Sequence, residues 1–217
     1  MSGPGPHTYR AVLFDLDGTL LDSADLIVTS FVDACRTGLG RTVDREETLR
    51  TWSWPVRERF EALAPGRGDE LTQLYLRRYF ELHDHRARLF PGVPAVLDGL
   101  RARGYLLGIV TSKRRATTDA AVRTFGLDRW CQAIVVDEDV RRPKPDPEPV
   151  ALAARRLGVA PAVALMVGDS VVDVAAGRRA GAGTAAALWG TMHLDDVLGE
   201  CPDHRLERPE ALLTVCL

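Results

Sequence analysis

Short apolar runs along the chain alternate with segments of helical periodicity. Four runs are rich enough in aliphatic residues to form buried strands, and they begin at Ala11, Tyr105, Ala133 and Ala162. Helical spacing of apolar residues appears in segments 93–103, 116–125 and 148–157. This alternation predicts an α/β fold with a doubly wound parallel sheet, in which ligands gather beyond the carboxyl ends of the strands.

A long helical stretch interrupts the alternation between the first and second strands. Apolar positions over residues 21–88 follow a helical period, and no strand-like run separates them. Because one crossover needs far fewer residues, we expect an inserted helical cap domain over 21–88. The α/β core then comprises residues 1–20 and 89–217.

Composition narrows the classes of function. Hydrophobic residues make up 46% of the chain, and the net charge of −2 offers no general attraction to nucleic acid. No apolar run approaches the roughly 20 residues that span a bilayer, so we expect no membrane partner. The polar first residues do not read as a secretory signal, and the four cysteines lack metal-site or disulfide spacing. These features predict a cytoplasmic protein, either a monomer or a homodimer.

Acidic residues follow the first and fourth predicted strands. Asp15 and Asp17 stand where the first strand ends, and Gly18 marks a turn there. Asp169 and Asp173 are four residues apart, so both can face one side of a helix. Carboxylates this close repel one another unless a cation lies between them, and oxygen ligands suit Mg²⁺. The alternative is ordinary helix capping by solvated aspartates.

Candidate phosphate-binding groups follow the other two strands. Thr111 and Ser112 offer hydroxyl and backbone N–H groups near a helix N-terminus, and Lys144 lies between prolines that restrict the backbone. Lys113 and Lys144 are the only lysines among 28 basic residues, so a lysine here is conspicuous. Taken singly, these residues are also typical of a helix cap and a solvated loop; with the carboxylates they favour a phosphoryl-binding site.

Together these segments resemble the four motifs of the haloacid dehalogenase superfamily. The chain reads DLDGT from Asp15, TS at Thr111, KP at Lys144 and GDSVVD around Asp169. The resemblance covers essentially the whole chain and implies a Rossmann-like core with a helical cap between the first two motifs. FDLDGTLLDS, VTSK, KPDPEPV and MVGDS are most similar to phosphoglycolate phosphatases and a related pyrophosphatase.

The resemblance implies a catalytic role for several of these residues. Asp15 would attack phosphorus to form an aspartyl-phosphate, while Asp17 would protonate the leaving oxygen and later deprotonate the hydrolytic water. Thr111, the Ser112 amide and Lys144 would hold the phosphoryl oxygens.

The resemblance also implies a magnesium site. The ion would be held by the Asp15 side chain, the Asp17 backbone carbonyl and Asp169, with Asp173 behind these ligands. An acid at position 17 favours phosphate esters over dehalogenation, because a departing halide needs no proton.

Substrate choice is expected to come from the cap. The segment TWSWPVRER departs from the Gly-Pro-like turn found in related phosphatases. Trp54, together with Trp52, could narrow the pocket or stack on a substrate ring, and Arg57 or Arg59 could bind a second anionic group. The alternative is cap packing and a solvated face. His83–His85 could suggest a metal site but are more typical of a polar surface turn.

The sequence therefore predicts a Mg²⁺-dependent phosphatase acting on a small phosphorylated metabolite, either a phosphoglycolate-like monoester or pyrophosphate. One alternative is a sugar phosphomutase of the beta-phosphoglucomutase type, which carries the same motifs. Another is a catalytically silent phosphate-binding protein, although such a protein should lack at least one motif residue and none is missing.

Overall fold

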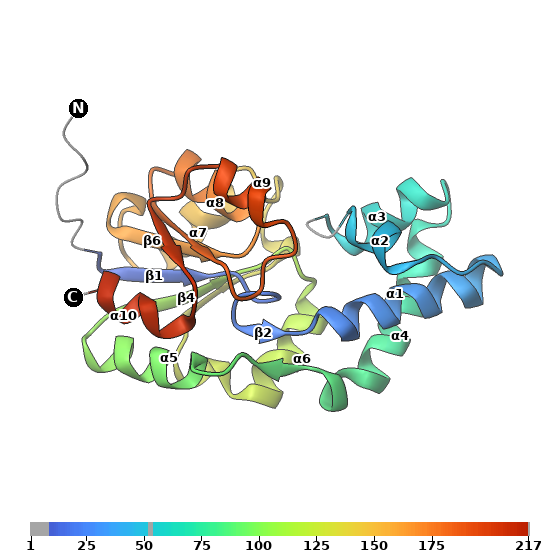
Figure 1. Ribbon diagram of the computed structural model, residues 1–217, viewed down its shortest axis with the longest axis horizontal. Coiled ribbons are helices and arrows are strands. Elements are labelled where there is room, and N and C mark those ends of the chain that lie inside the picture. Colours follow the sequence, from blue (N-terminus) through green and yellow to red (C-terminus); the bar gives the residue numbers. More distant parts are fainter. Residues whose placement is uncertain (1–8, 52–53, 217) are drawn as a thin grey trace.

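The core is a six-stranded parallel sheet (Figure 1), seen in a computed structural model that describes residues 9–51 and 54–216. The strands lie in the order β5-β4-β1-β6-β7-β8. Their bounds are β1 Ala11–Phe14, β4 Leu106–Val110, β5 Ala133–Val135, β6 Ala164–Gly168, β7 Gly183–Ala187 and β8 His204–Leu206. The predicted α/β class and parallel sheet are confirmed, and the four predicted strands are β1, β4, β5 and β6.

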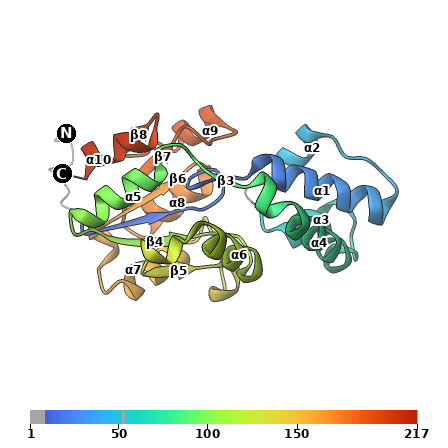
Figure 2. The ribbon, with the colours of Figure 1, turned by 90° about the horizontal axis from the view of Figure 1, so that it is seen from below.

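Helices cover both faces of the sheet. In Figure 1 the helices α7, α8 and α9 lie above the sheet, and α5 and α6 lie below it. Figure 2 shows the strands from the side of α5 and α6. The helices are α5 Val93–Ala102, α6 Arg115–Phe125, α7 Glu148–Arg156, α8 Val171–Arg179, α9 Leu194–Gly199 and α10 Leu212–Val215. None of the helices in the described ranges is both long and apolar enough to cross a membrane.

The alternation of side chains along β1 explains the two layers. Ala11 and Leu13 point into a cluster with residues of α7 and α8, whereas Val12 and Phe14 point into a cluster with residues of α5 and α6. All four side chains are buried, as expected for a central strand covered on both faces.

A helical segment lies beyond the carboxyl ends of the strands, at the right of Figure 1. It comprises α1 Ala24–Leu39, α2 Arg45–Leu49, α3 Val56–Leu63 and α4 Gly68–Arg86. Its own apolar cluster includes Phe31 and Phe60, whose rings stack with centroids 4.3 Å apart. The chain enters through β2 Leu21–Asp22 and leaves through β3 Arg88–Leu89, and these two short strands pair antiparallel.

Candidate active site

One pocket collects residues that follow three different strands. Asp15 directly follows β1, Thr111 follows β4 and Asp169 follows β6, while Lys144 lies between β5 and α7. Parallel strands present their carboxyl ends at one edge of the sheet, so these side chains meet there. All four line a pocket with about 740 Å³ of empty space, open mouth included, a size suited to a small molecule.

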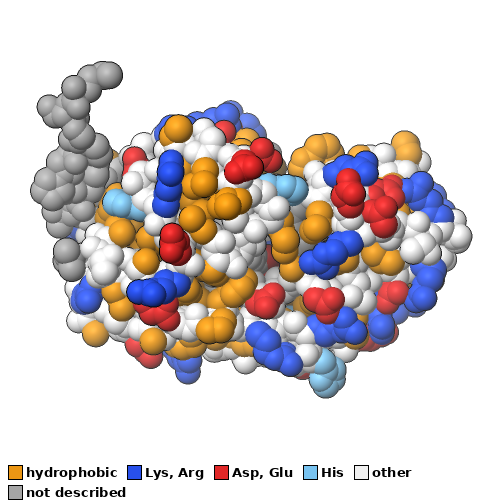
Figure 3. All heavy atoms as spheres, viewed as in Figure 1, with side chains coloured by type: hydrophobic (Ala, Val, Ile, Leu, Met, Phe, Trp, Pro, Cys, Tyr) orange, Lys and Arg blue, Asp and Glu red, His pale blue; other side chains and the backbone are white. Residues whose placement is uncertain are grey.

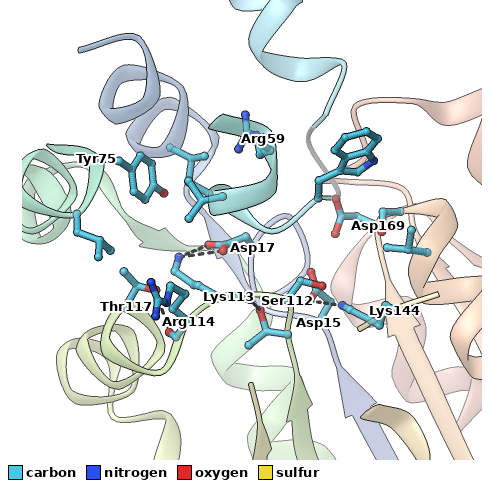
Figure 4. A pocket seen from close by; sticks show the side chains of 17 residues that line it. Asp15, Asp17, Arg59, Tyr75, Ser112, Lys113, Arg114, Thr117, Lys144 and Asp169 are labelled. Carbon is cyan, nitrogen blue, oxygen red and sulfur yellow. Dashed lines mark hydrogen bonds and ion pairs between the residues drawn. The ribbon is translucent and has the colours of Figure 1, made fainter. Parts of the chain in front are cut away.

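The pocket lies between the sheet and the helical segment. The molecular surface is hollowed where these two parts meet (Figure 3). The close view in Figure 4 shows Asp15, Ser112 and Lys144 on the side of the sheet, with Arg59 and Tyr75 on the side of the helices. A bound molecule would therefore touch both parts.

Three buried carboxylates meet around one ammonium group. Asp15, Asp169 and Asp173 each offer an oxygen atom, and these atoms lie within 4.8 Å of one another. Lys144 Nζ donates to Asp15 Oδ1 at 2.7 Å, to Asp173 Oδ1 at 2.5 Å and to the carbonyl oxygen of Val110 at 3.0 Å. A single positive charge thus pairs with two of the three carboxylates, and no ion pair is formed by Asp169 within the described residues.

Burial of this cluster shifts its acid–base equilibria. Desolvation raises the pKa of Asp15 to about 7, an effect that Lys144 opposes and Asp173 reinforces. Desolvation also raises the pKa of Asp169 well above its usual range, with Asp15 and Asp173 adding to the rise. Burial alone would lower the pKa of Lys144, but the two neighbouring carboxylates raise it above its ordinary value, so the ammonium stays charged. The cluster therefore needs further positive charge to be fully ionised.

Glycine at position 18 allows Asp169 to approach the first strand. Gly18 has φ of +87°, and a Cβ atom there would overlap the Asp169 carboxylate. A Cβ atom at Gly190 would in turn overlap the carbonyl of Gly18. Thr19 Oγ1 donates to Asp169 Oδ1 at 3.1 Å and orients the carboxylate. The turn predicted after the first strand is the point at which two separate segments touch.

Asp173 is held by its own helix as well as by Lys144. Its Oδ2 accepts hydrogen bonds from the backbone N–H and the hydroxyl of Ser170, while its Oδ1 accepts from Lys144. A Cβ atom at Gly168 would overlap the Asp173 side chain. Both carboxylate oxygens are thus engaged by protein donors.

Asp17 forms an ion pair that the sequence interpretation did not assign. Lys113 Nζ lies 2.7 Å from Asp17 Oδ1 and 2.8 Å from Oδ2, and the Ser23 hydroxyl donates to Oδ1 at 2.5 Å. The same ammonium lies 4.7 Å from the centre of the Tyr79 ring in α4. Lys113 was missing from the predicted site, although the scarcity of lysine in the chain was a signal for it.

The family is decided by comparison with known proteins. Residues 12–187 match the family model described as haloacid dehalogenase-like hydrolase. The chain belongs to this family. The suspected resemblance is therefore confirmed, and the segments carrying Asp15, Thr111, Lys144 and Asp169 all lie within the matched range.

Relatives in the family point to phosphatase activity. The chain is 38% identical to pyrophosphatase PpaX of Bacillus velezensis, over 94% of this chain and 95% of that protein. It is 36% identical to pyrophosphatase PpaX of Bacillus pumilus, over 96% of each chain. The solved structure of a Lactobacillus plantarum protein assigned as a phosphoglycolate phosphatase superposes with a TM-score of 0.86, at 27% identity, covering 96% of this chain and 99% of the other. The protein is a haloacid dehalogenase-like phosphatase.

Residues of the helical segment line part of the pocket. Arg59 lines the pocket and is 4% exposed, and Trp54 lines it while being 52% exposed. Arg57 is not among the described lining residues; it is exposed and pairs with Asp69 at 2.7 Å. Trp52 lies outside the described residues. Of the two arginines considered, only Arg59 reaches the pocket.

The surface turn expected at His83–His85 is wrong, because the segment lies within helix α4 and His83 is buried. This residue lies within α4, is 2% exposed and packs against the rings of Tyr79 and Phe125. Helical periodicity in α4 turns position 83 inward together with Tyr79, four residues earlier. Asp84 and His85 are exposed, as expected of surface positions, but they also lie within the helix and not in a turn.

Proposed function

We propose that this phosphatase hydrolyses a small phosphorylated metabolite in a Mg²⁺-dependent reaction, through an aspartyl-phosphate on Asp15. The observation that carries the proposal is the placement of Asp15. Its carboxylate lines the pocket, contacts the Lys144 ammonium at 2.7 Å and lies within 4.8 Å of oxygens from Asp169 and Asp173.

The carboxylate cluster fits a magnesium ion. Hard oxygen donors are the ligands that Mg²⁺ prefers, and three buried carboxylates facing one ammonium lack positive charge. The Asp15 side chain, the Asp17 backbone carbonyl and Asp169 would hold the ion, and Asp173 would stand behind them because its oxygens already bind Ser170 and Lys144. When bound, magnesium would neutralise charge on the phosphoryl oxygens.

Two aspartates divide the chemistry. An Asp15 oxygen attacks phosphorus while the bond from phosphorus to the leaving oxygen breaks, and Asp17, acting in its protonated form, gives that oxygen its proton and becomes a carboxylate. Asp17 then takes a proton from water as the water oxygen attacks phosphorus and releases Asp15. Lys113 pairs with the Asp17 carboxylate at the pocket wall and so stabilises the form that accepts the proton from water.

Positively charged and hydrogen-bonding groups would position the transferred phosphoryl group. Thr111, Ser112 and Lys144 line the pocket on the same side as Asp15. Lys144 is held by Asp173 and by the Val110 carbonyl, so its charge is fixed in place. Fixed charges of this kind stabilise a phosphoryl transition state without further reorganisation.

Residues 21–88 would form the cap domain that selects the substrate. The segment has its own apolar cluster and joins the core through the paired strands β2 and β3. Trp54 at the pocket would limit the size or shape of what enters. Pyrophosphate and a phosphoglycolate-like monoester are the proposed substrate classes, because relatives carry these names. We also propose that the protein acts in the cytoplasm.

Phosphate release from a substrate panel tests the function. Pyrophosphate, phosphoglycolate, sugar phosphates and nucleotides would be incubated with the protein, with magnesium or with EDTA. We expect release from one of the first two substrates only with magnesium. We expect no turnover by Asp15→Asn, which should keep its fold. Turnover by Asp15→Asn would remove Asp15 from its role, and isomerisation of a sugar phosphate with little release would identify a phosphomutase instead.

A further inference from the structure

Four cationic side chains line the pocket in the described part of the chain, and three of them have carboxylate partners. Lys144 pairs with Asp15 and Asp173, Lys113 pairs with Asp17, and Arg114 pairs with Glu138. Arg59 forms no ion pair with any described residue. Of these four cations in the described part of the pocket, Arg59 is therefore the one without a carboxylate partner.

The surroundings of Arg59 hold the guanidinium in place without neutralising it. Nε donates to the Thr51 hydroxyl at 3.3 Å, and Nη2 donates to the Thr48 carbonyl oxygen at 2.8 Å. Cζ lies 4.4 Å from the centre of the Phe31 ring. Nη1 donates to none of the described residues, so part of the donor fork remains available for a ligand.

Burying a cation without an ion-pair partner lowers the stability of a protein, so an unpaired buried arginine suggests a role in binding. Arg59 is 4% exposed, and burial lowers its pKa to about 10, so it is still charged at neutral pH. A buried charge that lacks a partner lowers stability unless something compensates it. An anion entering the pocket would provide that compensation, and a guanidinium binds carboxylate or phosphate oxygens in a bidentate manner.

The position of Arg59 defines where such an anion would lie. Arg59 comes from α3 on the helical side of the pocket, whereas Asp15 and Lys144 come from the side of the sheet (Figure 4). A phosphoryl group attacked by Asp15 would therefore be separate from the group that reaches Arg59. One molecule can satisfy both only if it carries two anionic groups.

We propose that Arg59 binds the second anionic group of the substrate, so that the enzyme selects compact molecules with a phosphoryl group and another phosphate or carboxylate. This inference rests on the proposed phosphatase function of the same pocket. A phosphomonoester with no second anion would leave Arg59 buried and unpaired, and would be turned over less efficiently.

Kinetics of arginine variants test this selection. Pyrophosphate and phosphoglycolate supply a second phosphate or a carboxylate, and p-nitrophenyl phosphate supplies neither. A hydrogen bond between charged groups corresponds to about 10- to 100-fold in binding. Arg59→Met should therefore lower kcat/KM for at least one two-anion substrate about 30-fold more than for p-nitrophenyl phosphate. Loss with only one of the two would identify the second anion as phosphate or carboxylate.

Arg57 supplies a matched control on the same helix. Arg57→Met removes an exposed guanidinium paired with Asp69, and should leave the ratio between the substrates unchanged. Arg59→Lys keeps the charge but loses the planar fork, and should fall between wild type and Arg59→Met. Equal losses with all three substrates in Arg59→Met, or no loss with any, would overturn the proposal.

Binding to the unmodified protein tests the inference even if Arg59 variants fold poorly. Calorimetry would compare methylphosphonate, which has one anionic group, with methylenediphosphonate and phosphonoacetate, which have two, at constant free magnesium. We expect at least one two-anion ligand to bind about 30-fold more tightly. Equal affinities would overturn the inference. Turnover by Asp15→Asn would reject the proposed mechanism alone, because this binding comparison does not depend on catalysis.

Discussion

Replacing Lys144 by Met should destabilise the protein more than replacing Lys113 by Met, the only other lysine of the chain. Lys144 is 7% exposed, and its ammonium forms ion pairs with Asp15 and Asp173. Oxygen atoms of these two carboxylates lie within 4.8 Å of one from Asp169. Removing one partner of a buried ion pair costs about 3–5 kcal/mol, because the remaining charge is left unpaired. Lys113 pairs with one carboxylate instead of two, and the side chain of Asp17 is 17% exposed, so a smaller loss of about 1–2 kcal/mol is expected.

Protonation sets an upper limit on the cost of the Lys144 substitution. A carboxylate left unpaired can take up a proton instead of remaining charged. For a carboxylate with an ordinary pKa of about 4, this protonation costs about 5 kcal/mol at pH 8 and about 2 kcal/mol at pH 5.5. The loss of stability should therefore be about 4 kcal/mol at pH 8 and at most about 2 kcal/mol at pH 5.5. A protein of ordinary stability, about 5–15 kcal/mol, would remain folded in either case.

Urea unfolding in EDTA and in magnesium measures these differences. A ligand present at 100 times its Kd adds about 2.7 kcal/mol to the free energy of unfolding. Magnesium should raise the stability of Lys144→Met more than that of wild type, because the ion then replaces the only cation in the cluster. Equal destabilisation by the two lysine substitutions, or equal gains from magnesium in Lys144→Met and wild type, would refute the electrostatic account.

Three further predictions concern the metal-free cluster, the Gly18 turn and the cap. The pKa of Asp15 is raised to about 7, so the stability that its protonated form contributes is lost as the pH rises toward 7. In EDTA, the urea midpoint of wild type should therefore fall more between pH 5 and pH 8 than that of Asp15→Asn. Gly190→Ala should lower kcat at least about 10-fold, because the new Cβ displaces the Gly18 carbonyl; unchanged kcat would contradict this contact. Phe60→Ala should cost about 3–5 kcal/mol in thermal unfolding, since it empties the centre of the helical cluster.

Local composition explains which strands could be predicted. The strands β1, β4, β5 and β6 contain valine, leucine, isoleucine or phenylalanine, the residues that mark buried strands in a sequence. In contrast, β7 reads GTAAA and β8 has only three residues, His204–Leu206. Alanine does not favour strands, and β8 has a single aliphatic residue, whereas the equally short β5 reads AIV. These two strands form because the sheet edge beside β6 offers hydrogen-bonding partners, which local sequence does not encode.

Topology explains which site residues could be predicted. Asp15, Thr111 and Asp169 end parallel strands, so their convergence follows from the fold class alone. The pairing of Lys113 with Asp17 could not be predicted in this way, because it depends on how the loop after β4 folds back. The sequence showed only that a lysine was unusual there.

The position of each side chain around helix α3 could have distinguished Arg59 from Arg57. Arg59 lies three residues after Val56 and four residues before Leu63, so it shares a face of α3 with both. Arg57 is offset from that face, and it lies exposed beside Asp69. The missing information was the location of the pocket, which only the arrangement of α3 against the sheet provides.

The shape of the lysine side chain explains why lysine, and not arginine, pairs with Asp15 and Asp17. The chain uses arginine for 26 of its 28 basic residues, yet Lys113 and Lys144 are the cations that contact Asp17 and Asp15. An ammonium is a compact charge with three donors, and Lys144 uses them on Asp15, Asp173 and the Val110 carbonyl. A planar guanidinium could not direct donors to three such separate oxygens around one atom. Arg59, by contrast, lines the pocket with Nη1 donating to none of the described residues, so its planar fork suits a carboxylate or phosphate ligand.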